Sequence, residues 1–264
     1  MIFMSATPLT SKRSYIFNRK LFKLTLLSTL SMKILIVSAT EKEIAPLLEQ
    51  LTPIGKKDSG SKKYSYKNHS IDVLITGIGM VASTYHLTKA LAENKYDLAL
   101  NLGIAGSFAP KGSLGNKKIK IGSVVNVAND SFSEMGAEDG DEFLSLIQIG
   151  LLKENEFPFT KGEIINSSKI KNAAIDGLQK VKGITANKVH GNKASIQDIL
   201  TRFSPQIESM EGAAFLYVCA IEKIPCAQVR SISNYVERRN KENWNIPFAI
   251  ENLNQKAIEI LSRF

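Results

Sequence analysis

Short apolar runs alternate along this chain with longer amphipathic segments, and this alternation restricts the possible folds more than any other feature. The runs have the length of buried strands and occur at 34–37, 71–76, 98–102, 124–128, 164–166, 184–186 and 227–232. Helical patterns occur at 41–51, 81–94, 141–152, 168–180, 212–223 and 248–263. Strands that alternate with helices in this way predict an α/β fold in which a mixed sheet carries helices on both faces.

The chain is long enough for one sizeable domain but short for two. It has 264 residues, of which 44% are hydrophobic, so a single core can form. We expect this domain to occupy residues 32–264, because Met32 opens directly onto the first strand pattern. Residues 1–31 contain five basic residues and no acid, and we expect them to be a disordered or wrongly included upstream extension. No apolar run is long enough to span a bilayer.

The basic charge does not indicate a nucleic-acid partner. The formal net charge is +9, and residues 1–31 supply five of these charges. The remaining lysines occur as scattered loop pairs and not as one stripe along a surface, which favours a small anionic substrate over nucleic acid. Cys219 and Cys226 form no C-x-x-C pair, so they predict reduced, packed thiols in a cytoplasmic protein without a metal site.

Several polar or glycine-rich stretches directly follow the strand patterns, where ligand sites gather in such folds. Thr40 and Glu43 follow the first strand at the spacing of a capping box, and the cap is the preferred interpretation of Glu43 by itself. Two turns, 77–79 and 103–106, place glycines after strands, where backbone amides can approach an oxygen-rich ligand. Most such turns are only tight turns, but two after consecutive strands are more suggestive.

Glu211 lies between an apolar segment and an alanine-rich helix pattern, where a charge is costly unless it is bonded. Its carboxylate could accept two hydrogen bonds from a vicinal diol, or it could complement the dipole of the helix that follows. Taken alone, the two interpretations have similar weight. Trp244 could stack on a purine, although a core position is the preferred interpretation of this residue alone.

In their order and spacing, these stretches together resemble the nucleoside phosphorylase and nucleosidase superfamily. The resemblance covers residues 32–264 and rests on Glu43, both glycine turns, the sequence Met-Glu-Gly-Ala-Ala at 210–214 and Arg-Ser-Ile-Ser-Asn at 230–234. It implies a three-layer α/β/α fold with a central mixed, strongly twisted sheet flanked by helices.

The resemblance also implies roles for individual residues. Glu43 would hold and deprotonate the water that attacks C1′ of a nucleoside, and Glu211 would bind the ribose hydroxyls. Met210 would pack on the sugar, and Arg230 would steady that end of the site. Gly79 and Ile104, from the two glycine turns, are further expected substrate contacts.

Asn234 is the most informative departure within this superfamily. Enzymes that act on methylthioadenosine and adenosylhomocysteine normally have aspartate at this position, which can give a proton to purine N7. Asparagine cannot deliver a proton, but its NH₂ group can donate hydrogen bonds to N7 and O6 of hypoxanthine. Asn234 therefore suits a 6-oxopurine and is expected to be catalytic together with Glu43.

Three further segments resemble the futalosine hydrolases within the superfamily: 130–139, 187–191, and Asn234 followed by Arg238, Arg239 and Trp244. The implied reaction is hydrolysis of futalosine to hypoxanthine and dehypoxanthine futalosine in menaquinone biosynthesis. Phe132 and Trp244 would enclose the purine and sugar, and the region of His190 would offer backbone groups to the purine edge. The side chain of His190 is more typical of a packed or capping histidine. Arg238 and Arg239 could bind the benzoate carboxylate of futalosine or could simply be surface charges.

Two other enzymatic functions and one binding function compete with this interpretation. A phosphorylase needs an anion pocket, but residues 100–102 supply no arginine and Ile104 stands where a hydroxyl is expected. A methylthioadenosine or adenosylhomocysteine nucleosidase is disfavoured by Asn234. A nucleoside-binding module without turnover is disfavoured by the presence of both Glu43 and Glu211. The resemblance implies no metal or organic cofactor, no nucleic-acid or membrane partner, and a homodimer.

Overall fold

The computed structural model describes residues 31–54, 61–108 and 119–264. By contacts the chain divides into two units, Met1–Ser31 and Met32–Phe264. Residues 1–31 were expected to be an extension. Of these, positions 1–30 lie outside the described residues. Within this described part, no helix is both long enough and apolar enough to cross a membrane.

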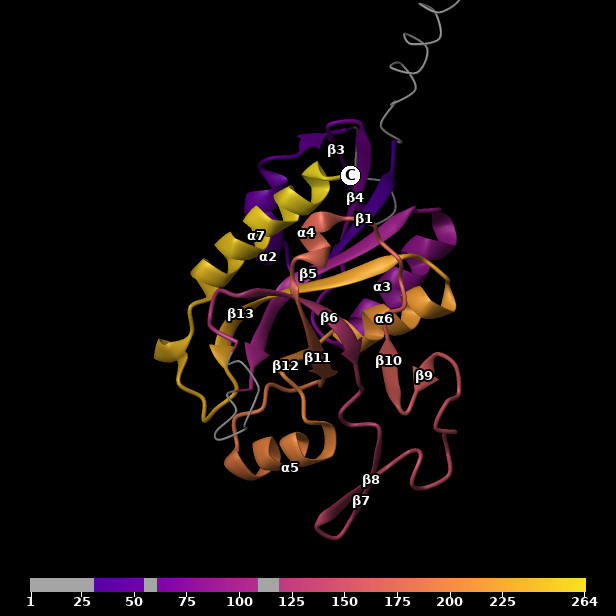
Figure 1. The fold of residues 1–264 in the computed structure, drawn as a ribbon, viewed down its shortest axis with the longest axis vertical. Helices are drawn as coiled ribbons and strands as arrows, with labels where there is room; N and C mark the ends of the chain where they lie inside the picture. Colours follow the sequence, from indigo (N-terminus) through magenta and orange to yellow (C-terminus); the bar gives the residue numbers. More distant parts are fainter. Residues whose placement is uncertain (1–30, 55–60, 109–118) are drawn as a thin grey trace, which may run out of the picture. The chain divides into compact units, whose positions relative to one another are not determined.

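The second unit is built on a large mixed sheet with helices on both faces (Figure 1). Its strand order is β2-β3-β4-β1-β5-β12-β11-β6-β10-β9, and β13 pairs with both β5 and β6. The strands are β1 (Lys33–Ser38), β2 (Thr52–Pro53), β3 (Ser61–Tyr66), β4 (His69–Ile75), β5 (Leu98–Ser107), β6 (Val124–Asp130), β9 (Phe159–Thr160), β10 (Glu163–Ile165), β11 (Gln179–Thr185), β12 (Ile207–Ser209) and β13 (Cys226–Tyr235). Strands β7 (Gly136–Asp139) and β8 (Glu142–Ser145) form a separate hairpin. The helices are α2 (Glu41–Leu48), α3 (Met80–Glu93), α4 (Ala173–Asp176), α5 (Lys193–Phe203), α6 (Gly212–Ile221) and α7 (Ile246–Ser262), with a 3₁₀ turn at Lys241–Asn243.

The alternation of side chains along β1 explains the three layers. Ile34 and Ile36 pack into a core cluster with α2, α4 and α7. Leu35 and Val37 point to the opposite face, into a cluster with α3 and α6. Successive strand residues face opposite sides of a sheet, so a strand that is apolar at every position requires cover on both faces. Figure 1 shows α2 and α7 on one side of the sheet and α3 and α6 on the other.

Half of the sheet closes on itself. Strand β5 is long enough to pair with β1 along its first part and with β12 near its end, while β13 lies parallel to it throughout. Strand β13 also pairs with β6, and β6 is joined to β12 through β11. Strands β5, β12, β11, β6 and β13 therefore form a ring, which the alternation of strands and helices could not predict.

The predicted strands and four of the predicted helices occur within a few residues of the expected positions, and the α/β class is confirmed. The helix expected at 141–152 is wrong. Asp139 pairs with Glu142 across a two-residue turn whose first residue, Gly140, has φ of +62°. A two-residue Gly-Asp loop, here Gly140-Asp141, indicates a hairpin, and it outweighs the apolar periodicity of the following residues.

The helix expected at 168–180 is also wrong over most of its length. The side chain of Asn172 accepts hydrogen bonds from the amides of Ala174 and Ile175, so the helix begins only after it. Gly177 ends helix α4, and strand β11 already begins at Gln179. Helix α5, which the sequence pattern did not predict, begins at a similar cap, where Asn192 accepts from the amides of Ala194 and Ser195.

Candidate active site

A cavity of about 400 Å³ lies where the ends of β1, β5, β12 and β13 converge. The loops that follow these strands supply most of its lining, as is usual for ligand sites in α/β sheets. The lining residues are Ala39, Thr40, Lys42, Glu43, Ile78, Ile104, Ala105, Gly106, Lys188, Val189, Glu208, Ser209, Met210, Glu211, Ser233, Asn234, Trp244, Ile246 and Ile250. The cavity therefore brings together six residues that the sequence predicted, namely Glu43, Ile104, Met210, Glu211, Asn234 and Trp244.

Glu43 closes the capping box and also reaches the cavity. Its Oε2 accepts hydrogen bonds from the amide and the hydroxyl of Thr40, at 3.0 and 2.9 Å. Its Oε1 accepts from the amide of Ile104 at 3.1 Å. The cap that the sequence favoured is thus present, and it holds one carboxylate oxygen while the other faces the glycine turn of β5. A carboxylate offers about four lone-pair sites, so Oε1 can bind one more donor.

The absence of a side chain at Gly103 allows two charged groups to approach β5. A Cβ placed at this residue would lie 2.1 Å from Nη1 of Arg230 and 3.1 Å from Oε1 of Glu43. At the first distance, the Arg230 guanidinium would have to move before any side chain could fit here. Gly103 therefore leaves room for Arg230 and Glu43, and the approach of ligand oxygens to this turn stays a prediction.

Glu211 is buried at the start of α6, where it is the N-cap residue. Its Oε1 accepts the amide of Gly79 at 2.9 Å, and Nη1 of Arg230 lies 3.9 Å from its Oε2. Burial raises the pKa of the Glu211 carboxyl above its ordinary value, although Arg230 and the Gly79 amide act in the opposite direction. Gly79 has φ of +94°, a conformation that glycine adopts readily. Its amide thus positions Glu211, and Gly79 does not itself line the cavity.

The amide group of Asn234 has its orientation set by its neighbours. Its Oδ1 accepts a hydrogen bond from the Ser233 hydroxyl at 2.7 Å, and its Nδ2 donates to the carbonyl of Tyr235 at 3.1 Å. The Tyr235 carbonyl oxygen can only accept a hydrogen bond, so the side-chain amide of Asn234 must point its NH₂ group, and not its oxygen, toward Tyr235. Because NH₂ carries two hydrogens, one N–H of this cavity-lining residue has no partner among the described residues.

Trp244 follows the 3₁₀ turn and lines the cavity, half-buried, so the preference for a core position was wrong. The guanidinium of Arg239 lies over its ring, with Cζ 5.5 Å from the ring centroid. Arg238 and Arg239 are both exposed, and neither lines the cavity. Their contact with a substrate carboxylate stays a prediction.

Phe132 and His190 lie outside this cavity. Phe132 packs edge-on against Phe159 and Tyr217, with ring centroids 6.4 and 6.3 Å away. His190 is buried, and its Nδ1 lies 2.7 Å from Oε2 of Glu208. Its neighbours Lys188 and Val189 do line the cavity, and the contact of backbone groups of this region with the purine edge stays a prediction.

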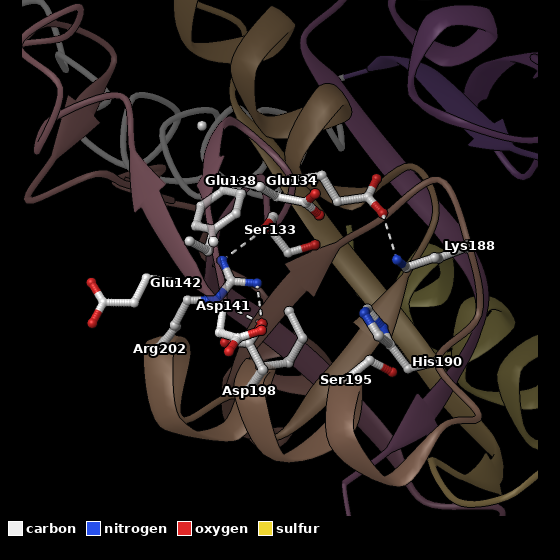
Figure 2. Close-up of a pocket in the computed structure, with 14 residues that line it drawn as sticks. Ser133, Glu134, Glu138, Asp141, Glu142, Lys188, His190, Ser195, Asp198 and Arg202 are labelled. Carbon is white, nitrogen blue, oxygen red and sulfur yellow. Dashed lines mark hydrogen bonds and ion pairs between the residues drawn. The ribbon is translucent and has the colours of Figure 1, made fainter.

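His190 instead borders a second cavity of about 440 Å³ between the β7–β8 hairpin and α5. Figure 2 shows the residues that line this second cavity, among them Glu134, Lys188 and Arg202, with Arg202 in an ion pair with Asp198. Lys188 lines both cavities and lies 3.9 Å from Glu134.

Sequence reasoning missed Glu208, which is buried and lines the active-site cavity. Its Oε1 accepts a hydrogen bond from the backbone amide of His190, and its Oε2 lies 2.7 Å from Nδ1 of the His190 ring. The two residues are eighteen positions apart, His190 in the loop between β11 and α5 and Glu208 in β12, so no local pattern joins them. The one available signal was the position of Glu208 two residues before Met210, in a three-residue strand whose residues are all buried.

Arg230 is 1% exposed and connects Glu211 with another buried acid, Asp130. Nε of Arg230 donates to Gln228 at 3.2 Å, and Nε2 of Gln228 donates to Asp130 at 3.1 Å. Nη2 of Arg230 donates to Oδ1 of Asn101. Burial raises the pKa of Asp130 from 3.8 to about 6, against the opposing effects of its hydrogen bonds and of Arg230.

This titration predicts a pH-dependent stability. The folded state binds the Asp130 proton more tightly than the unfolded chain, so the contribution of Asp130 to stability falls as pH rises from about 4 to about 6. The loss is about 3 kcal/mol in the free energy of unfolding. Urea unfolding across this range should show the loss in the wild type relative to Asp130→Asn, which cannot titrate. A difference between the two proteins that is independent of pH would contradict the assignment.

Comparison with known proteins identifies the family. The phosphorylase superfamily model matches residues 33–264. Futalosine hydrolase of Acidothermus cellulolyticus is 26% identical over 231 residues, which are 85% of this chain and 88% of that protein. The 5′-methylthioadenosine/S-adenosylhomocysteine nucleosidase of Haemophilus ducreyi is 25% identical over 243 residues, or 89% of this chain and 100% of that protein. The native structure of futalosine hydrolase of Helicobacter pylori has a TM-score of 0.72 at 20% identity, covers 90% of this chain and 100% of that one, and shows the same fold. This chain therefore belongs to the phosphorylase superfamily.

Proposed function

We propose that this protein hydrolyses the N-ribosidic bond of futalosine, releasing hypoxanthine and dehypoxanthine futalosine in menaquinone biosynthesis. The observation that carries the proposal is the orientation of Asn234, a cavity-lining residue whose NH₂ group keeps one unpaired N–H among the described residues while its Oδ1 accepts from the Ser233 hydroxyl. Hypoxanthine presents the acceptors N7 and O6 on one edge, and adenine presents a donor beside N7. A donor at this point of the cavity therefore favours the 6-oxopurine.

The reaction needs an activated water on one face of C1′ and stabilisation of the departing base. Oε1 of Glu43 is available to hold the water and accept its proton, because in the described part of the chain it accepts a hydrogen bond only from the Ile104 amide. Glu211 would accept hydrogen bonds from the ribose hydroxyls, with Met210 against the sugar. Asn234 cannot deliver a proton, so its role is to donate a hydrogen bond as negative charge moves onto the purine.

Water is preferred to phosphate as the nucleophile. A phosphorylase is expected to have an arginine shortly before the glycine turn of β5. This chain has Asn101 there, which is buried and accepts a hydrogen bond from Arg230. Ile104 contributes an apolar side chain to the cavity and no hydroxyl. The relative from Haemophilus ducreyi matches about as well as the futalosine hydrolase does, so the choice of substrate rests on Asn234 and not on overall identity.

The test is a reaction of the purified protein with futalosine in ¹⁸O-labelled water, with and without phosphate. The proposal predicts hypoxanthine release that is indifferent to phosphate, with one ¹⁸O incorporated at C1′ of the sugar product. A ribosyl phosphate product, or no release without phosphate, would reject hydrolysis. Release of hypoxanthine from inosine but not from futalosine would reject the substrate.

The proposal includes a cytoplasmic homodimer. Support for the dimer comes from three exposed apolar side chains: Ile78, which lines the cavity just before α3, and Val81 and Tyr85, which are four residues apart on α3. They are 62%, 81% and 62% exposed. Exposed apolar groups of this kind mark interaction surfaces when they are contiguous. Light scattering should give the mass of two chains; the mass of one chain would contradict this part of the proposal.

A further inference from the structure

Asp130 is a buried carboxylate for which the proposed reaction has no direct use. It is 1% exposed, at the end of β6. Its Oδ1 accepts from the amide of Ser131 at 2.9 Å and from the hydroxyl of Thr185 at 3.0 Å, and its Oδ2 accepts from Gln228. Among the described residues it has no ion pair, and hydrogen bonds connect it to Arg230 through Gln228.

The side chain of Gln228 lies between a hydrogen-bond acceptor, Asp130, and a hydrogen-bond donor, Arg230, so its amide group has one possible orientation. Its Nε2 donates to Asp130 and its Oε1 accepts from Nε of Arg230. A carboxylate has no hydrogen to donate and a guanidinium has no lone pair to offer. The ionised Asp130 thus fixes the carbonyl of Gln228 toward Arg230, and this bond holds the guanidinium whose Nη1 lies 3.9 Å from Glu211.

A second connection runs from Asp130 to the helix that begins after Glu211. The Thr185 hydroxyl donates to Asp130 and accepts from the amide of Ala213 at 2.7 Å. The backbone at Gly212 passes so close that an added Cβ would lie 2.3 Å from Oε1 of Gln228 and 2.4 Å from Oδ2 of Asp130. The glycine after Glu211 is therefore explained by the Asp130–Gln228 pair that packs against it.

We propose that Asp130 is a positioning residue that acts through Gln228 on Arg230 and so fixes the Glu211 carboxylate for binding ribose. The inference rests on the proposed function only in giving Glu211 the ribose hydroxyls. It predicts that the polarity of the chain of hydrogen bonds matters, and not only the presence of polar groups.

The test exchanges the acid and the amide. In Asp130→Asn the new side chain has one acceptor oxygen for the two positions that Asp130 fills, so it sets an NH₂ group either against the NH₂ of Gln228 or, if the amide turns, against the Ser131 amide. Gln228→Glu places two carboxylates against each other. In the double variant, the new amide at 130 can donate to the new carboxylate at 228, which again accepts from Arg230. All proteins are assayed well above the pKa of about 6 for Asp130. Ser131→Ala is the matched control, since the Ser131 hydroxyl is buried and has no partner in the described structure.

Each single variant should lower kcat/KM for the nucleoside that the wild type cleaves by at least about tenfold, as expected for a lost hydrogen bond to a charged group. In the double variant, kcat/KM should recover to within about threefold of the wild-type value. The control Ser131→Ala should have the wild-type kcat/KM. If Asp130→Asn does not fold, Gln228→Glu and the double variant still form the comparison. Singles that equal the wild type, or a folded double variant that is no better than the singles, would overturn the proposal.

Calorimetric binding separates positioning from a general structural defect. The single variants should bind inosine about tenfold more weakly, because it carries ribose, and should bind free hypoxanthine as the wild type does. Equal weakening of both ligands would overturn the positioning role. A wild type that cleaves another nucleoside but not futalosine would reject the proposed substrate, and the comparison among the variants would still test Asp130.

Discussion

Glu43→Gln should abolish base release while the protein still binds purine. The general base contributes about 10²- to 10⁴-fold to such reactions, and glutamine cannot accept the proton from water. We therefore expect kcat to fall by about 10³-fold or more, with little change in the dissociation constant for hypoxanthine. Single-turnover assays and calorimetry on the same preparation measure both quantities.

The structural cost of this substitution should be small by comparison. Glutamine has one acceptor oxygen for the two groups that Glu43 now satisfies, the Thr40 cap and the Ile104 amide. Loss of a cap costs about 0.5–2 kcal/mol, so the variant should fold with a modestly lower Tm. Glu41→Gln, which alters an exposed acid in the same first helical turn, is the matched control and should retain full activity. Undiminished turnover by a folded Glu43→Gln protein would eliminate Glu43 as the base.

Asn234→Asp should change which purine the enzyme releases. An ionised carboxylate would face O6 of hypoxanthine and also the Tyr235 carbonyl that now accepts from Nδ2. Two opposed acceptors are unfavourable, and sites built to pair with a substrate group reject the wrong partner strongly. We expect kcat/KM for futalosine to fall at least about a hundredfold. Once protonated, the new carboxyl can donate to N7, so release of adenine from methylthioadenosine should increase.

A matched control separates chemistry at the purine from added charge. Asn240→Asp makes the same change at an exposed residue outside the cavity, where aspartate can still cap the 3₁₀ turn. It should leave the kcat/KM ratio for the two nucleosides unchanged. If Asn234→Asp also leaves this ratio unchanged, Asn234 does not read the purine.

Those parts of the fold that depend on local chemistry were predictable from the sequence. The burial of Ile34, Leu35, Ile36 and Val37 on alternating faces of the sheet follows from an uninterrupted apolar strand, and the cap formed by Thr40 and Glu43 follows from their spacing. Closure of β5, β12, β11, β6 and β13 into a ring was not predictable, because it depends on non-local pairing. At 141–152, where a helix was expected, the turn pair Gly140-Asp141 overrides the apolar periodicity.

The candidate site divides along the same line. Glu43, which follows β1, and Asn234, near the end of β13, were predicted from the superfamily resemblance, and both lie where strand ends gather at one edge of the sheet. The sequence alone did not show that Gly79 donates its amide to Glu211 or that Gly103 leaves room for Arg230. The partnership of Glu208 with His190, and that of Asp130 with Gln228, join segments far apart in the chain. Such pairs become visible only once the fold places them together.

The most direct test of the central claim is a comparison of kcat/KM for futalosine and for methylthioadenosine on the same wild-type preparation. The donor orientation of Asn234 predicts that futalosine is favoured at least about a hundredfold, with hypoxanthine as the released base. Equal values, or a preference for methylthioadenosine with release of adenine, would contradict the account of Asn234 and leave only the superfamily assignment.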